Sequence, residues 1–119
     1  MKKIQEGLKE AFDLTHAKNA STTDLKALYK RLITEEYNEL MEESSGSPED
    51  FKELCDLLWV SIQYANACGY DLSKGMGALA EEYGSKFYTK DGEFEALYRE
   101  DGKLLKNTGF KKADFSNLL

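Results

Sequence analysis

Hydrophobic residues recur at helical spacing through the first 87 residues of this 119-residue chain. Residues three or four positions apart share one face of a helix, so such stripes predict amphipathic helices. The first stripe lies in a segment from about Lys2 to Ala17 and consists of Ile4, Leu8 and Phe12. The second opens a segment that runs to about Glu43 and consists of Leu25, Leu28 and Leu32. The pattern predicts two helices that each bury one face.

The third segment, from Pro48 to about Cys68, has start and stop signals at both ends. Ser47 is placed to cap the helix, proline suits its first position, and Asp50 completes a capping-box-like arrangement. Gly69 is typical of a helix C-terminus. The segment is apolar on most sides through its middle, which predicts the central helix of a bundle.

The second and fourth helices also have candidate caps. Thr22 or Thr23 can cap the second, with Asp24 favourable in its first turn. Asp71 can cap a fourth helix over residues 72–87. Three glycines weaken that helix intrinsically, so packing must hold it.

The character of the chain changes after residue 87. Asp91-Gly92 and Asp101-Gly102 are turn signals, and residues 97–98 can pair with residues 104–105 as a short hairpin. The tail carries too many large apolar residues for a disordered linker, and we expect it to pack on the bundle or on a neighbouring subunit. The sequence therefore predicts one all-α domain over residues 1–119. It comprises an antiparallel bundle of about four main helices to residue 87 and an irregular extension over 88–119.

Composition and charge narrow the function classes. Hydrophobic residues make up 41% and charged residues 32%, an ordinary soluble composition. A net charge of −6 disfavours a nucleic-acid polymer as partner, and no apolar run approaches the roughly 20 residues of a membrane span. Cys55 and Cys68 match no zinc spacing and are expected to be small buried hydrophobes. No signal core follows Met1, so we expect a reducing, cytoplasmic location.

Asp56 interrupts the most apolar stretch of the chain, residues 54–60. A carboxylate among apolar side chains is costly to bury unless its charge is compensated. Glu53 lies three residues earlier, on the same helix face. On the second predicted helix, three glutamates continue the apolar stripe instead of opposing it: Glu35, Glu36 and Glu39. The acidic residues of both helices thus face the interior of the predicted bundle.

These carboxylates can converge on one point, because helices joined by a short turn are antiparallel neighbours and both groups lie near that turn. Oxygen ligands without histidine or cysteine suit Mg²⁺, or Mn²⁺ as a substitute, better than zinc. Such a site favours phosphate transfer or hydrolysis. In the alternative interpretation, the glutamates form a solvated helix face and Asp56 pairs with Lys30 or Arg31.

At these residues the chain resembles the all-α nucleoside triphosphate pyrophosphohydrolases, the MazG-like group, which includes dimeric dUTPases, dCTPases and phosphoribosyl-ATP pyrophosphohydrolases. The family pattern is Glu-x-x-Glu, a spacer, and Glu-x-x-Asp. Here it is residues 36–39, thirteen intervening residues, and residues 53–56. The blocks that also look like the family are 56–60, 64–72, 85–87 and 99–106, the last similar to tails of short phage and bacterial members.

The resemblance implies hydrolysis of a nucleoside triphosphate to a monophosphate and pyrophosphate, with a lean towards a purine deoxynucleotide. It implies Mg²⁺ bound by Glu36, Glu39, Glu53 and Asp56, with Glu35 assisting. It also implies a homodimer or homotetramer. Related short members often carry an asparagine just before the Ser-Lys pair, where this chain has Tyr83-Gly84.

Four further residues are candidate substrate contacts, each with a structural alternative. Asn66 can meet the sugar or base or make a polar contact within the bundle. Lys86 and, more weakly, Lys74 can meet phosphate or be surface lysines. Trp59 can stack on a base or belong to the core. His16, the only histidine, is expected to be a helix-end residue instead of a base.

Two other functions stay open from the sequence. One is a different substrate, such as phosphoribosyl-ATP, on the same acidic site. The other is a non-catalytic helical assembly or nucleotide-binding protein in which the acidic cluster is structural.

Overall fold

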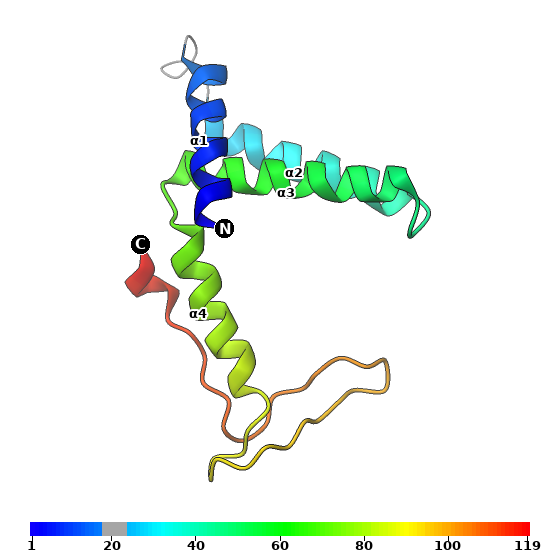
Figure 1. Ribbon diagram of the computed structural model, residues 1–119, viewed down its shortest axis with the longest axis vertical. Coiled ribbons are helices and arrows are strands. Elements are labelled where there is room, and N and C mark those ends of the chain that lie inside the picture. Colours follow the sequence, from blue (N-terminus) through cyan, green and yellow to red (C-terminus); the bar gives the residue numbers. More distant parts are fainter. Residues whose placement is uncertain (18–23) are drawn as a thin grey trace. The chain divides into compact units, whose positions relative to one another are not determined.

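The computed structural model describes residues 1–17 and 24–119 of the chain (Figure 1). The described residues form four α-helices and one short 3-10 helix, without a β-strand, which confirms the all-α prediction. They divide into two compact units, Met1–Leu72 and Ser73–Leu119. The boundary between these units therefore lies earlier in the chain than residue 87, where the sequence placed the boundary between the helical core and the extension. Within the described part, no helix has the length and apolarity needed to cross a membrane.

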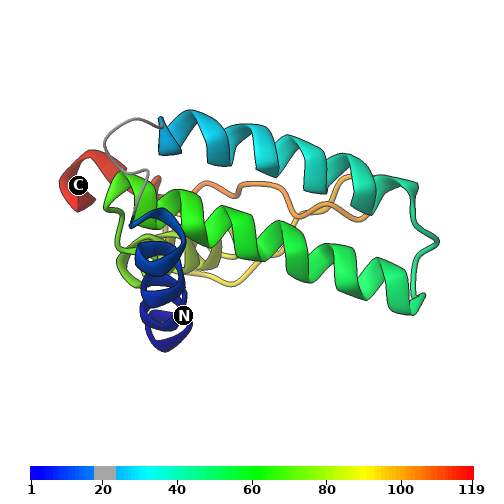
Figure 2. The same ribbon diagram turned by 90° about the horizontal axis from the view of Figure 1, so that it is seen from above.

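The first unit contains α1 (Lys2–His16), α2 (Leu25–Glu42) and α3 (Pro48–Cys68). Figures 1 and 2 show α2 and α3 side by side, joined by a short turn and running in opposite directions as predicted. The first helix crosses α3 instead of running alongside it (Figure 1). Since α3 contacts both other helices, it is the central element of this unit.

The ends of α3 follow the sequence signals closely. Ser47 Oγ accepts a hydrogen bond from Asp50 N at 3.1 Å, and Gly69 ends the helix with a left-handed φ of 75°. The Asp50 carboxylate accepts from Gly46 N at 3.2 Å, one residue before the position that a standard capping box uses. These contacts are local, so the helix boundaries follow from the sequence.

The start of α2 differs from the prediction. Asp24 is the N-cap, and its side chain accepts a hydrogen bond from Ala27 N at 3.1 Å. The predicted alternatives, Thr22 and Thr23, lie outside the described residues. An aspartate at this position both satisfies a free backbone donor and complements the positive end of the helix dipole.

The core of the first unit is aromatic and joins all three helices. Phe12, Tyr29 and Val60 are buried together. His16 Nε2 lies 2.7 Å from the Tyr29 hydroxyl, and burial raises the pKa of that tyrosine. His16 is the last residue of α1, which confirms the expected helix-end position, and the structure adds that its side chain is buried in the core. Phe12 likewise packs in the core.

The second unit begins at Ser73, the second residue of α4 (Leu72–Ser85), and includes the C-terminal extension, which ends in a 3-10 helix, Phe115–Leu118. Lys111 N donates to Ser85 Oγ at 2.9 Å, and Ala113 N donates to Glu82 Oε1 at 3.1 Å. A methyl group added at Gly75 would lie 3.4 Å from the Phe115 ring, so this glycine leaves room for the ring. The extension thus packs on α4, which explains why both belong to one unit.

The predicted hairpin across Asp101-Gly102 is confirmed. Tyr98 and Leu104 form an antiparallel bridge, Leu105 N donates to Leu97 O at 2.7 Å, and the turn glycine has a φ of 92°. A similar hairpin forms at the other turn signal, where Tyr88 bridges Phe94. The turns and their short ladders give the extension its order without a full sheet.

Gly109 marks a close crossing within the second unit. Its N–H donates to Tyr88 O at 2.9 Å, and an added Cβ would lie 2.5 Å from Tyr88 O and 2.6 Å from Thr89 O. Since these are backbone atoms, Gly109→Ala is expected to destabilise the second unit by about 1–3 kcal/mol. Amide hydrogen exchange of residues 73–119 measures the loss.

The matched control is Gly77→Ala in α4, where an added Cβ meets nothing within 4 Å. This change is expected to stabilise the helix by up to about 1 kcal/mol through helix propensity. Equal changes in stability for Gly109→Ala and Gly77→Ala would contradict the claim that the close backbone contact at Gly109 stabilises the second unit.

Candidate metal centre

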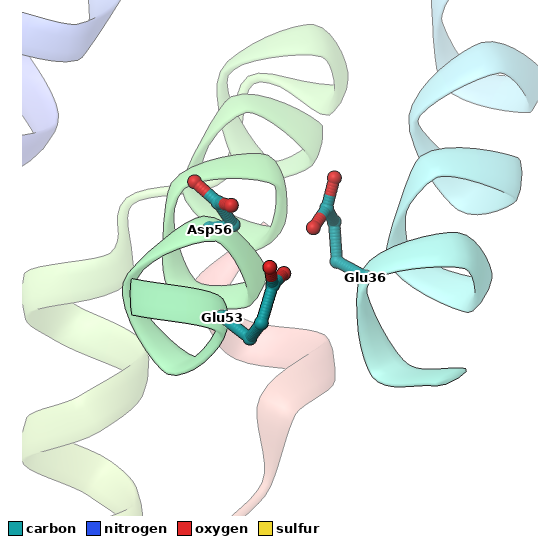
Figure 3. A group of neighbouring side chains, drawn as sticks. All are labelled: Glu36, Glu53 and Asp56. Carbon is teal, nitrogen blue, oxygen red and sulfur yellow. The ribbon is translucent and has the colours of Figure 1, made fainter. Parts of the chain in front are cut away.

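Three carboxylates converge between α2 and α3. Glu36 projects from α2 and Glu53 and Asp56 project from α3, so that the three carboxylates lie near one another (Figure 3). One oxygen of each lies within 4.8 Å of the others, and all three residues are partly buried. The convergence expected from the sequence is therefore present for these three residues.

The local sequence explains this arrangement. Glu53 and Asp56 are three residues apart on α3, so they share one helix face. The turn between Glu42 and Pro48 reverses the chain, which brings α2 back along that face. Because Glu36 lies in the second half of α2 and the pair lies in the first half of α3, the three side chains reach the same level.

Two of the cluster's oxygens have no hydrogen-bond donor. Glu36 Oε2 and Glu53 Oε2 are buried and make no hydrogen bond in the structure. Leaving a buried polar atom unsatisfied costs about 1–3 kcal/mol, and more when the group is charged. A proton or a bound cation would remove this cost, so the two oxygens are consistent with a cation between the helices.

The cluster shifts the pKa of its own members. Desolvation, followed by the interaction with Glu39 and the charges of Asp56 and Glu53, raises the pKa of Glu36 to about 7. Desolvation and the hydrogen bond with Glu39 also raise the pKa of Glu53, while the Lys52 ammonium opposes this effect. Near neutral pH, the site therefore holds excess negative charge that is only partly neutralised by protons.

The two other predicted acidic residues differ in position. Glu39 is exposed, yet its side chain interacts with both Glu36 and Glu53, which places it at the edge of the cluster. Glu35 is exposed on α2 and does not belong to the group of converging carboxylates. The structure thus brings together four of the five predicted acidic residues.

Lys52 is the cation that the sequence interpretation missed. Its ammonium forms an ion pair with Asp56, one helical turn away, and lies 4.0 Å from Glu53 Oε1. The alternative interpretation paired Asp56 with Lys30 or Arg31, but its ion pair in the structure is with Lys52, and Lys30 Nζ lies 5.6 Å from the centre of the Tyr64 ring. The spacing of four residues on one helix was the signal that could have identified Lys52.

Lys52→Gln is expected to tighten Mn²⁺ or Mg²⁺ binding by roughly two- to fivefold, the range of an exposed ion pair. The ammonium competes with a metal for the Asp56 oxygen and repels its charge. Calorimetric titration of the metal-free protein measures the change. Lys26→Gln, an exposed lysine at the start of α2, is the control and should leave affinity unchanged. Weaker binding by the Lys52 variant would show that the lysine does not compete.

The donor set fits a hard divalent cation. Mg²⁺–oxygen bonds are about 2.1 Å long, so two oxygens on one ion are at most about 4.2 Å apart. In the structure one oxygen of each residue lies within 4.8 Å of the others, close to this limit. Small side-chain rotations of Glu36 and Glu53 would bring their oxygens to a shared ion and would also satisfy their unpaired oxygens. We therefore assign Glu36, Glu53 and Asp56 as candidate ligands, with Glu39 beside them.

Trp59 lies outside this cluster, in an apolar surface of the first unit. It is 51% exposed and lines a pocket of about 220 Å³ with Met1, Ile4 and Cys55 among others. The expectation that Cys55 is buried was wrong, because this part of α3 faces away from α2; Cys68 is half-buried. Trp59 is thus available to a ligand or partner, although it is not one of the converging residues.

Asn66 makes contacts between helices. Its Oδ1 accepts from Gln5 Nε2 at 3.1 Å, and its Nδ2 donates to Gln63 Oε1 at 3.0 Å. Gln63 is 2% exposed and donates in turn to Leu8 O at 2.9 Å. The polar contact within the bundle, one of the two alternatives for this residue, is therefore the one that the structure contains.

The two lysine candidates belong to the second unit. Lys74 lies on α4, and Lys86 follows its last residue. Lys86 Nζ lies 4.0 Å from the centre of the Tyr83 ring. Tyr83 thus contacts Lys86 through a cation–π interaction.

No protein-family model, curated protein or solved structure matches the chain.

Proposed function

We propose that this chain is a Mg²⁺-dependent nucleoside triphosphate pyrophosphohydrolase that converts a (d)NTP to the (d)NMP and pyrophosphate. The observation that carries the proposal is the convergence of Glu36, Glu53 and Asp56, with two buried oxygens that lack donors. The MazG-like residue pattern 36–39 and 53–56 supports the same activity.

Glu36, Glu53 and Asp56 would bind Mg²⁺ through their carboxylate oxygens. Glu39 interacts with Glu36 and Glu53 and could supply a further oxygen ligand. A bound Mg²⁺ supplies charge neutralisation for phosphate oxygens and lowers the pKa of water. Glu35, exposed one residue before Glu36, is proposed to assist by orienting water. Each role uses a carboxylate that is ionised, which requires that Glu36 lose its proton first.

Space for a polar ligand adjoins the cluster. An open pocket of about 350 Å³ is lined by Lys52 and Glu53, together with Glu43, Pro48 and Glu49. Its acidic lining favours a phosphate ligand only when cations accompany it, since phosphate and carboxylate repel each other. This supports a metal–triphosphate complex as substrate in preference to a free nucleotide. Our lean towards a purine deoxynucleotide rests on the resemblance to short phage-type sequences.

The decisive experiment incubates the protein with each nucleoside triphosphate and Mg²⁺ and separates the products. Pyrophosphate and one monophosphate in equal amounts support the proposal and identify the base. Release of inorganic phosphate alone contradicts it. If the protein hydrolyses phosphoribosyl-ATP but no nucleoside triphosphate, phosphoribosyl-ATP is its substrate. If no compound yields a product, the result favours a non-catalytic nucleotide-binding or assembly role.

We further propose a homodimer or homotetramer located in the cytoplasm, as the resemblance implies. The half-exposed apolar residues of α3, which include Leu58 and Trp59, are compatible with a covered surface in an assembly. Light scattering of the purified protein measures the mass, and a single 13.5 kDa species contradicts the assembly.

A further inference from the structure

Another cavity is lined only by residues of the Ser73–Leu119 unit, whereas the carboxylates of the acidic cluster belong to the Met1–Leu72 unit. It measures about 420 Å³, which is within the range of small-molecule pockets. The side chains that decide its chemistry are two lysines, two threonines and two aromatic residues: Lys90, Lys111, Thr89, Thr108, Tyr88 and Phe110. Its residues come from the start and the end of the extension, which the fold brings together.

Backbone contacts hold the cavity walls in place. Gly109 N donates to Tyr88 O at 2.9 Å, and Lys90 N donates to Thr108 Oγ1 at 2.9 Å. On the other side, Lys111 N donates to Ser85 Oγ at 2.9 Å. Because the walls are fixed in this way, little ordering free energy is needed before a ligand binds.

The charge of the cavity is opposite to that of the chain. The chain carries a net charge of −6, yet Lys90 and Lys111 line the cavity and no carboxylate side chain does. Neither ammonium forms an ion pair within the described ranges, 1–17 and 24–119. Two lysines without an ion pair in the lining of one cavity favour an anionic ligand.

The threonine hydroxyls add neutral donors. Thr108 Oγ1 accepts from Lys90 N, and Thr89 Oγ1 accepts from Glu93 N at 3.1 Å. In the described part of the chain neither hydroxyl donates to an acceptor, so both O–H groups are available. The cavity thus presents ammonium and hydroxyl donors, which match the several acceptor oxygens of a phosphate group.

We propose that this cavity binds a small phosphate-bearing molecule, with Lys90 and Lys111 at the phosphate. Its volume exceeds what a phosphate group alone requires, and Tyr88 and Phe110 offer apolar surface for the remainder of the ligand. The site is independent of the acidic cluster and of the proposed hydrolysis.

A titration of the ¹⁵N-labelled full chain, followed by amide resonances in EDTA, tests the proposal. EDTA removes divalent cations, so the acidic cluster cannot recruit a nucleotide through a metal, and failure of the proposed hydrolysis does not affect the result. The probes are AMP, ribose 5-phosphate, inorganic phosphate and adenosine. We expect saturable shifts for amides of residues 88–92 and 108–111 with the three phosphate compounds, and none with adenosine.

Lys90→Ala combined with Lys111→Ala is expected to weaken AMP binding at least about tenfold, the effect of losing charged hydrogen bonds. The control is Lys112→Ala, which removes one positive charge from the residue next to the cavity lining and should leave affinity unchanged. Unaltered resonances elsewhere verify that each variant is folded. Equal binding of adenosine and AMP, unchanged affinity in the double variant, or no saturable shift with any phosphate compound would each overturn the proposal.

Discussion

Asp56→Asn is expected to lower Mg²⁺-dependent pyrophosphate release by about 100-fold or more. Loss of an outer-shell partner of a metal ligand already costs about 10- to 100-fold, and Asp56 is proposed to be a ligand itself. Asparagine keeps the size of the side chain and removes the charge that balances the cation. Steady-state release of pyrophosphate at saturating nucleotide measures the loss.

The fold of the Asp56 variant should survive, because the side chain is only partly buried and its ion pair with Lys52 is exposed. Exposed ion pairs contribute about 0–1 kcal/mol to stability. Circular dichroism and the melting temperature check this point.

Glu10→Gln is the matched control for charge removal: Glu10 is exposed on α1, outside the acidic cluster. Glu39→Gln should follow Asp56→Asn in activity. Undiminished turnover in either of the two cluster variants would overturn the site assignment.

Metal affinity is expected to fall about tenfold for each pH unit below about 7. The pKa of Glu36 is raised to about 7, so a metal must displace a proton from this carboxyl group at lower pH. Because the carboxyl group is already half protonated at pH 7, the apparent affinity for Mn²⁺ should fall about 50-fold between pH 7 and pH 5. Calorimetric titration across this range measures the slope. Glu36→Gln should bind the metal more weakly and lose most of the slope, and an unchanged slope in that variant would contradict the assignment of the proton.

The stability of the metal-free protein should depend on the same proton. The pKa of Glu36 is about 7 in the folded state and 4.5 in a free glutamate, so the folded state holds the proton more tightly. The stabilisation is fully present below pH 4.5 and is lost as the pH rises through about 7. Glu36→Gln has no proton to lose, and its melting temperature relative to the wild type should therefore rise over this interval. Mg²⁺ should reduce the difference above pH 7.

Sequence alone predicted the features that depend on a few neighbouring residues. Ser47 and Gly69 mark the ends of α3, because cap hydrogen bonds and a left-handed glycine are local requirements. The shared face of Glu53 and Asp56 follows from helical periodicity. The turn at Gly102 follows from the residue type, because glycine readily adopts the positive φ that this turn requires. The antiparallel pair of α2 and α3 follows from the short turn between them.

Only the tertiary structure decided which distant groups meet. It shows that Lys52, not Lys30 or Arg31, pairs with Asp56, and that Asn66 joins helices. It also packs the extension on α4. Such contacts depend on which side chains are buried and on how backbone segments cross, and neither can be predicted from the helical spacing of hydrophobic residues.

The acidic cluster combines both kinds of information. Sequence spacing placed its carboxylates on two facing helix surfaces. The packing of α2 against α3 then buried one oxygen each of Glu36 and Glu53 without a donor, which raises the pKa of both residues. The physical reason is that desolvation depends on every atom around a group, whereas helical spacing depends only on its position along the chain.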